Sequence, residues 1–170
     1  MAPHAQLDAS ALTLASQRLG PLPIINHFLE RLGLEALLDR FVQTNDPRTK
    51  IPNSTCLGVL LRSIIVHREP IYRQHETVCA YANGVFGVSA RQAKHLVDDS
   101  IGRALDRLFL ADRGALLTAC VVAAGKVFGL SFKELHNDST SVRFCGQYPL
   151  ARGRAVRGKR APFIVAPWVG

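Results

Sequence analysis

The sequence predicts a mainly α-helical protein, in which a multi-helix bundle is followed by the first strands of a β-containing unit. Between residues 21 and 130, apolar residues recur at three- and four-residue spacing in segments separated by Gly, Pro, Asn and Asp. Over residues 132–144, apolar residues are interspersed with Ser and Thr, which is typical of strands. We therefore expect a flexible N-terminus over residues 1–20, a helical domain over 21–130 and an incomplete β-containing segment over 131–170.

A helical hairpin is expected at the start of the helical domain. The segment Gly20–Pro23 should break the chain, and residues 24–32 then carry a helical apolar stripe. Gly33 ends this helix, and residues 34–42 repeat the pattern. The short connection between the two predicts neighbouring helices.

Two further helices are expected in the middle of the domain. Ser54 or Thr55 can cap a helix that runs to His67, and a second helix is expected over residues 71–81. The first should bury Leu57, Leu60, Leu61, Ile64 and Ile65, and the second should direct Arg73, Gln74, His75 and Glu76 outward.

A pair of helices resembling a helix-turn-helix is expected over residues 89–110. Ser89 and Gln92 have the spacing of a capping box, and Asp98 or Asp99 can cap the following helix. Four cations on this pair would be available to DNA phosphates: Arg91, Lys94, Arg103 and Arg107. The alternative is a bundle with a purely structural role, which the acidic residues of the same segment favour.

The last helix, over residues 115–128, is the most apolar and should lie at the centre of the bundle. Two strands are expected after it, over residues 132–144 and 161–165, joined by a basic loop. No apolar run reaches the roughly 18 residues of a membrane span, and the N-terminus lacks the order of a signal peptide. We therefore expect a cytoplasmic protein with no membrane partner.

The positive charge is concentrated in the last quarter of the chain. The net charge is +8, and residues 131–170 hold seven Lys or Arg against two Asp or Glu. Such a cluster suits a polyphosphate partner such as DNA, and it is equally compatible with a solvated loop. Its members are Arg152, Arg154, Arg157, Lys159 and Arg160.

The four cysteines have wide spacings and form no Cys-x-x-Cys pair. Most lie in apolar helical contexts, so we expect reduced, packed thiols. His75 and Cys79 lie four residues apart and could share a helix face, but two ligands without a second pair rarely form a zinc site.

A single carboxylate, Asp138, interrupts the first predicted strand. A charged group at a strand centre is costly unless it is paired, hydrogen-bonded or bound to a metal. The residues alone leave alternatives open: Asp138 is a metal ligand, or it is a strand-end Asp that caps a turn or pairs with Arg143.

The order of these segments resembles the N-terminal portion of bacterial insertion-sequence transposases of the DDE class. The resemblance extends from Gly20 to Lys159, and two pieces carry most of it. These are the helix Ile101–Leu108 and the segment from Asp138-Ser139-Thr140-Ser141 through Tyr148 to Gly153-Arg154-x-x-Arg157-Gly158-Lys159.

The resemblance implies a helical domain followed by the start of a ribonuclease-H-like catalytic domain. Asp138 would be the first carboxylate of the DDE triad and a ligand of Mg²⁺ or Mn²⁺, which favour oxygen ligands. The basic cluster and the four helical cations would contact DNA at the terminal inverted repeats of the transposon. The partners implied are this DNA and a second copy or full-length transposase, in a cytoplasmic protein associated with the nucleoid.

The chain departs from the family after Lys159, where residues 161–170 diverge and no second Asp or final Glu follows. We therefore expect a truncated transposase, with an incomplete triad that binds no metal by itself and performs no catalysis alone. The alternative is a non-catalytic module that binds transposon ends or full-length transposase.

Overall fold

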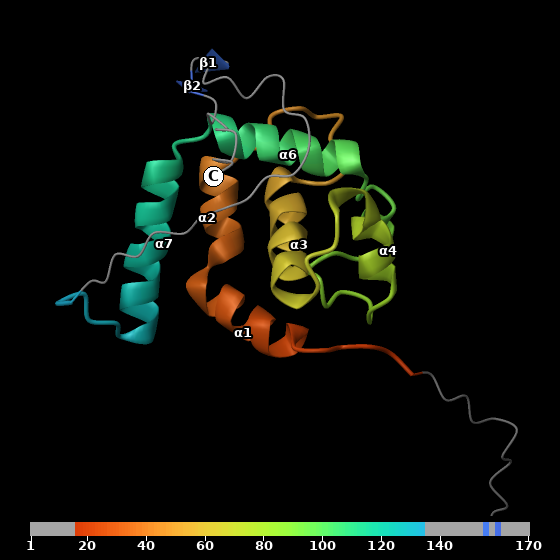
Figure 1. Cartoon of the computed structure of the whole chain (residues 1–170), viewed down its shortest axis with the longest axis horizontal. Helices are drawn as coiled ribbons and strands as arrows, with labels where there is room; N and C mark the ends of the chain where they lie inside the picture. The colour runs from red at the N-terminus through yellow and green to blue at the C-terminus, as the bar shows by residue number, and fades with distance from the viewer. Residues whose placement is uncertain (1–15, 135–154, 157–158, 161–170) are drawn as a thin grey trace, which may run out of the picture.

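The computed structural model describes residues 16–134, 155–156 and 159–160. Within them the chain is mainly helical, as predicted, and α1, α2, α4 and α6 pack around one central helix, α3 (Figure 1). The helices are α1 (Leu22–Leu32), α2 (Leu34–Phe41), α3 (Asn53–Val66), the 3₁₀ helix η2 (Ile71–Arg73), α4 (Gln74–Cys79), α5 (Ala90–Ala93), α6 (Asp98–Leu110) and α7 (Arg113–Phe128). The strands are β1 (Ala155–Val156) and β2 (Lys159–Arg160).

The central helix α3 packs against α6, α2, α4 and α1. Its buried apolar side chains are Cys56, Leu57 and Val59, whereas Ile64 and Ile65 are exposed. The predicted face of α3 is therefore wrong at its C-terminal end. Apolar residues occur all around this helix, so their spacing alone does not select the face that α6 covers.

The start of α1 differs from the prediction. The helix α1 begins at Leu22 rather than at residue 24, with Pro21 at its N-cap and Pro23 in its first turn. Proline has no backbone N–H, but the N–H groups of the first helical turn have no partner within the helix. The two prolines of Gly20–Pro23 are therefore compatible with a helix that starts at Leu22.

The start of α3 is held by the preceding loop rather than by Ser54 or Thr55. The backbone N–H of Asn53 donates to Thr44 Oγ1 at 2.8 Å, and Asn53 Nδ2 donates to the carbonyl of Gln43 at 3.0 Å. Ser54 and Thr55 are buried inside the first turn, so the predicted side-chain cap is wrong. These hydrogen bonds fix the α2–α3 loop, residues 42–52, to the end of α3.

The pair α5–α6 begins as expected and then differs. The capping box is confirmed, because Ser89 Oγ accepts from the Gln92 N–H and Gln92 Oε1 accepts from the Ser89 N–H. The helix α6 starts at Asp98, after an N-cap at Val97, so Asp98 and Asp99 lie in its first turn rather than at its cap.

The helix expected over residues 71–81 is shorter and divides into η2 and α4. Gln74 was expected to point outward, but its side chain is fully buried, with 0% exposed. Its Nε2 donates to the carbonyls of Glu69 and Pro70, at 2.9 and 3.3 Å. The buried amide of Gln74 therefore binds the segment at Glu69 and Pro70 to the start of α4, which the apolar pattern does not reveal.

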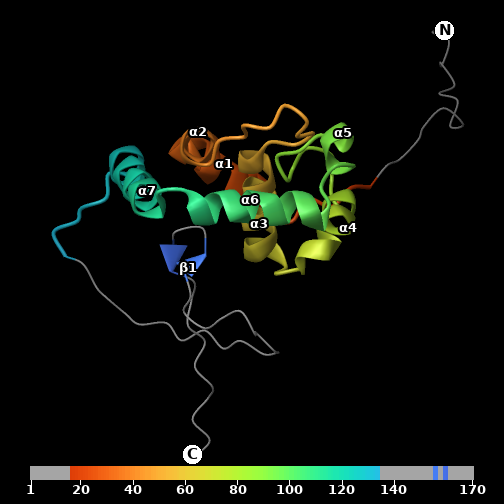
Figure 2. The same ribbon diagram turned by 90° about the horizontal axis from the view of Figure 1, so that it is seen from above.

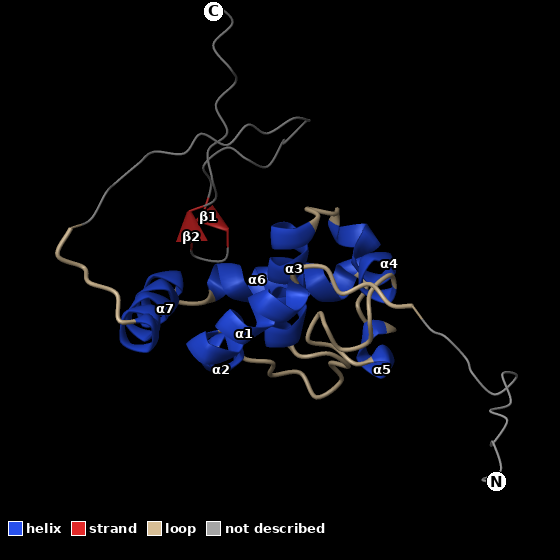
Figure 3. Cartoon of the chain, turned by 90° about the horizontal axis from the view of Figure 1, so that it is seen from below, coloured by secondary structure: helices blue, strands red, loops and turns tan. Residues whose placement is uncertain are grey.

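The helix α7 lies at the edge of the bundle, against α1 and α2, and not at its centre (Figures 1 and 3). None of its residues is buried, and Leu117 is 66% exposed. The prediction of a central position is therefore wrong. Among the described residues, no single helix is long and apolar enough to cross a membrane; α6 and α7 together reach that length, with a 91° bend between them.

The predicted strands are only partly described. Phe132–Glu134, the start of the first predicted strand, is not a strand, while residues 135–144 and 161–165 lie outside the described residues, as do residues 1–15. The strands β1 and β2 pair antiparallel inside the expected basic loop, with Ala155 opposite Arg160 and Val156 opposite Lys159.

Candidate nucleic-acid interface

A basic groove of about 910 Å³ lies between the α2–α3 loop and the α5–α6 segment. In Figure 2 this loop extends toward α5, and α6 runs across the molecule beside α3. The lining of the groove includes five cationic side chains and two carboxylates, those of Asp46 and Asp106. The cations are Arg48, Lys50, Lys94, Arg103 and Arg107, and His95 lines the groove beside them.

The loop wall of the groove is ordered by an Asp46–Arg48 contact. The Arg48 side chain donates from Nε and NH2 to the two carboxylate oxygens of Asp46, each at 3.1 Å, and its backbone N–H donates to Oδ1 at 2.9 Å. These hydrogen bonds lower the pKa of Asp46 to about 2, with the side-chain bond as the largest cause. Asp46 therefore stays charged at neutral pH and pairs with Arg48, whose side chain is 89% exposed.

The helical wall is supplied mainly by α6. Its buried residues Ile101 and Ala104 face α3, and Arg103 and Arg107, four residues apart, project from one face into the groove. Arg103 also pairs with Asp99 at 2.9 Å across an exposed turn. Such an exposed pair contributes little to stability, so Arg103 can exchange Asp99 for a phosphate at small cost.

The short turn after α5 places Lys94 and His95 at the same groove. The structure therefore brings together three of the four cations that were expected to contact phosphates, namely Lys94, Arg103 and Arg107. The fourth, Arg91, is exposed on α5 and is not part of the groove lining.

Sequence reasoning missed Arg48 and Lys50, which complete the groove from the α2–α3 loop. They lie more than 40 residues before the α5–α6 cations, as their numbers in the sequence show. The Asp46-Pro47-Arg48 turn indicates a loop, but no local signal indicates where that loop packs.

The remaining predicted site residues lie elsewhere. Asp138 and Arg152, Arg154 and Arg157 are outside the described residues, so the catalytic and metal-binding role predicted for Asp138 stays a prediction. Lys159 and Arg160 form strand β2. Within residues 16–134, no group of three or more His, Cys, Asp or Glu side chains could hold a metal ion.

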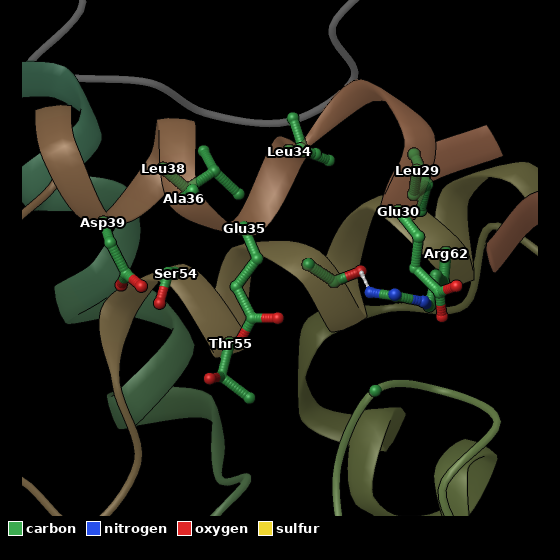
Figure 4. A pocket seen from close by; sticks show the side chains of 13 residues that line it. Leu29, Glu30, Leu34, Glu35, Ala36, Leu38, Asp39, Ser54, Thr55 and Arg62 are labelled. Carbon is green, nitrogen blue, oxygen red and sulfur yellow. Dashed lines mark hydrogen bonds between the residues drawn. The ribbon is translucent and has the colours of Figure 1, made fainter. Parts of the chain in front are cut away.

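A second hollow, of about 450 Å³, lies between α1, α2 and α3 and has the opposite charge. Figure 4 shows Glu35 and Asp39 of α2 extending toward Ser54 and Thr55 at the start of α3, with Glu30 beside Arg62. Three carboxylates against one guanidinium would repel a phosphate, so this hollow does not extend the basic groove.

Sequence comparison identifies a family for this chain. No curated protein and no solved structure matches the chain. A family model described as "Domain of unknown function (DUF4277)" matches residues 14–122, which include both walls of the basic groove. The matched segment covers well over half of the chain, and the protein therefore belongs to the DUF4277 family.

Proposed function

We propose that this chain is the N-terminal portion of an insertion-sequence DDE transposase, and that its helical part binds DNA through the basic groove. One observation carries the DNA-binding part of the proposal: cations from two distant segments, the α2–α3 loop and the α5–α6 segment, converge on one groove. A groove with an excess of Lys and Arg attracts the phosphate backbone. The DUF4277 domain is known in transposase-like proteins, which supports the transposase part.

The proposed contact is with the DNA backbone rather than with base edges. In a helix-turn-helix protein, residues at the N-terminus of the second helix contact bases. Here that first turn carries Asp98 and Asp99, which would repel DNA. Arg103 and Arg107 lie farther along α6 and open onto the groove, where they suit phosphates.

Two-metal phosphoryl transfer uses several carboxylates to hold the ions, and Asp138 is a single candidate ligand. The basic groove is lined by residues 44–110, so the proposed DNA contact does not involve Asp138. This separation favours a second candidate function, a non-catalytic module that occupies transposon ends or joins full-length transposase. In both proposals the groove is the DNA contact.

The test is DNA binding by the full chain as a function of salt. We would measure the fluorescence anisotropy of labelled duplexes of several sequences between about 50 and 200 mM NaCl. Each phosphate contact contributes about 0.9 to the slope of log K against log salt. Lys94→Ala and Arg107→Ala should each lower that slope by about 0.9, to the same extent for every sequence.

The matched control is Lys126→Ala, which removes the same charge from an exposed position near the end of α7, outside the groove. Equal slopes for the groove variants and this control would refute the proposed interface. Adding Mg²⁺ or Mn²⁺ to the bound duplex separates the two functions. Nicking that Asp138→Asn abolishes would support catalysis by this chain, and binding without nicking would support the non-catalytic module.

A further inference from the structure

The exposed residues His75 and Cys79 lie one turn apart on α4, and neither lines the basic groove. Cys79 Sγ lies 3.7 Å from His75 Nε2, and His75 Nδ1 lies 2.7 Å from the carbonyl oxygen of Ala93 on α5. Three groups are therefore aligned: a thiol, an imidazole and a carbonyl that holds the imidazole in place.

The contact with Ala93 fixes the tautomer of His75. A carbonyl oxygen can only accept a hydrogen bond, so Nδ1 must carry the proton. In the neutral ring Nε2 then has the free lone pair, and that lone pair faces the thiol of Cys79. A thiol next to a basic nitrogen that is oriented by a third group is the arrangement of an activated nucleophile.

We propose that Cys79 is a reactive thiol, activated by His75, that forms a mixed disulfide with low-molecular-weight disulfides. The Cys79 thiol transfers its proton to His75 Nε2, and the thiolate attacks one sulfur of the disulfide. A new S–S bond forms to Sγ, the S–S bond of the reagent breaks, and the second half leaves as a thiolate that takes up a proton. No other oxidant is needed, because the reagent disulfide is itself reduced.

The other described thiols provide the contrast. Burial raises the pKa of the Cys56 thiol to about 11, and that side chain is only 1% exposed. Burial also raises the pKa of Cys120, which is half-buried on α7. Cys79 differs from both because it combines exposure with a basic partner.

Charged side chains also occur on the elements packed against α4. These elements are α3, η2 and α5, and their charged side chains are Arg62, Arg73 and Arg91. Arg62 is bound to Asn26 and to the carbonyl of Gly58, and the carboxylate of Glu76 lies on α4 itself. The activation of Cys79 is therefore attributed to His75 alone.

The test is the rate of modification of the full chain by 5,5′-dithiobis(2-nitrobenzoic acid), an aromatic disulfide, followed from pH 5 to 9. We expect a fast phase that Cys79→Ser removes and Cys120→Ser leaves unchanged. His75→Gln keeps an amide that can donate to Ala93 but has no basic nitrogen. It should slow the fast phase by at least about tenfold at neutral pH and change how the rate of that phase depends on pH.

Two results would overturn the proposal: a fast phase that survives Cys79→Ser, or a His75→Gln variant that reacts at the wild-type rate with the wild-type pH profile. Far-UV circular dichroism shows whether His75→Gln folds. If His75→Gln does not fold, peptide mapping of the modified wild-type protein provides the test. Preferential labelling of Cys79 over Cys145 below pH 7 supports the proposal, and equal labelling of the two refutes it.

Discussion

The side chain of Arg62 joins three segments of the bundle, and we expect its removal to be costly. Arg62 lies on α3 and donates from Nε to Asn26 Oδ1 of α1 at 2.7 Å, and from NH1 to the carbonyl of Gly58 at 3.0 Å. Asn26 Nδ2 in turn donates to the carbonyl of Val85 at 2.8 Å. At Gly87, a Cβ would lie 3.1 Å from the guanidinium carbon, so the loop after α4 passes close to it.

The substitution Arg62→Met retains the apolar stem and removes both hydrogen bonds. A hydrogen bond to a charged group contributes about 1.5–3 kcal/mol, and a half-buried acceptor left unpaired costs about 1–3 kcal/mol. Burial lowers the pKa of Arg62, which shows that its charged form is partly desolvated, and removing the charge regains part of that cost. We therefore expect a net loss of about 2–3 kcal/mol, or roughly 5–10 °C in Tm.

Urea denaturation followed by circular dichroism measures this loss. The matched control is Arg40→Met, because Arg40 is exposed on α2 with its guanidinium over the ring of Phe41, 5.3 Å from the centroid. It should cost no more than about 0.5 kcal/mol. Combining Arg62→Met with Asn26→Leu should cost less than the sum of the two single changes, because the shared Arg62–Asn26 hydrogen bond is then lost once rather than twice. A loss below about 0.5 kcal/mol for Arg62→Met, or strict additivity, would refute this reasoning.

Three further predictions concern other parts of the bundle. Ser89→Ala removes the acceptor of the capping box at α5 and should cost about 1 kcal/mol in urea denaturation, whereas Ser89→Asp should retain most of the stability. Burial raises the pKa of Cys56 to about 11 from an ordinary value of 9.0, so its stabilising effect is complete below pH 9 and is lost between pH 9 and 11. The decline in stability over that range should therefore be shallower in Cys56→Ala. Leu117→Gln on the exposed face of α7 should change the free energy of unfolding by less than about 0.5 kcal/mol, and a larger loss would contradict the exposure of that side chain.

The local signals in the sequence predicted most of the helices. Apolar spacing identified α1, α2, α3, α6 and α7, and Gly33 and Gly129 end α1 and α7 in the left-handed conformation, with φ of 67° and 63°. The capping box of Ser89 was also predicted from spacing alone. Each of these features depends on residues within a few positions of one another.

The features that the sequence did not predict depend on distant contacts. The N–H of Asn53 is satisfied by Thr44 rather than by a neighbouring hydroxyl, and the buried amide of Gln74 binds carbonyls in a turn. The basic groove is a similar case. Lys94, Arg103 and Arg107 were candidates because they are close in sequence, but Arg48 joins them only because the α2–α3 loop folds over α6. A charge count along the chain does not contain that information.

The position of α7 shows why apolar composition is a poor guide to position within one bundle. A helix that is apolar on all sides needs cover on all sides, yet in the described residues α7 packs mainly against α1 and α2. After Gly129 the chain turns back, and the ring of Phe132 lies against Gly125, where a Cβ would be 2.5 Å from it. Leu117, Val121 and Gly125 follow one another at four-residue spacing, so Phe132 lies at one end of the exposed stripe. The hydropathy of α7 therefore matches a helix with more than one packing surface, and the bundle of residues 16–134 uses one of them.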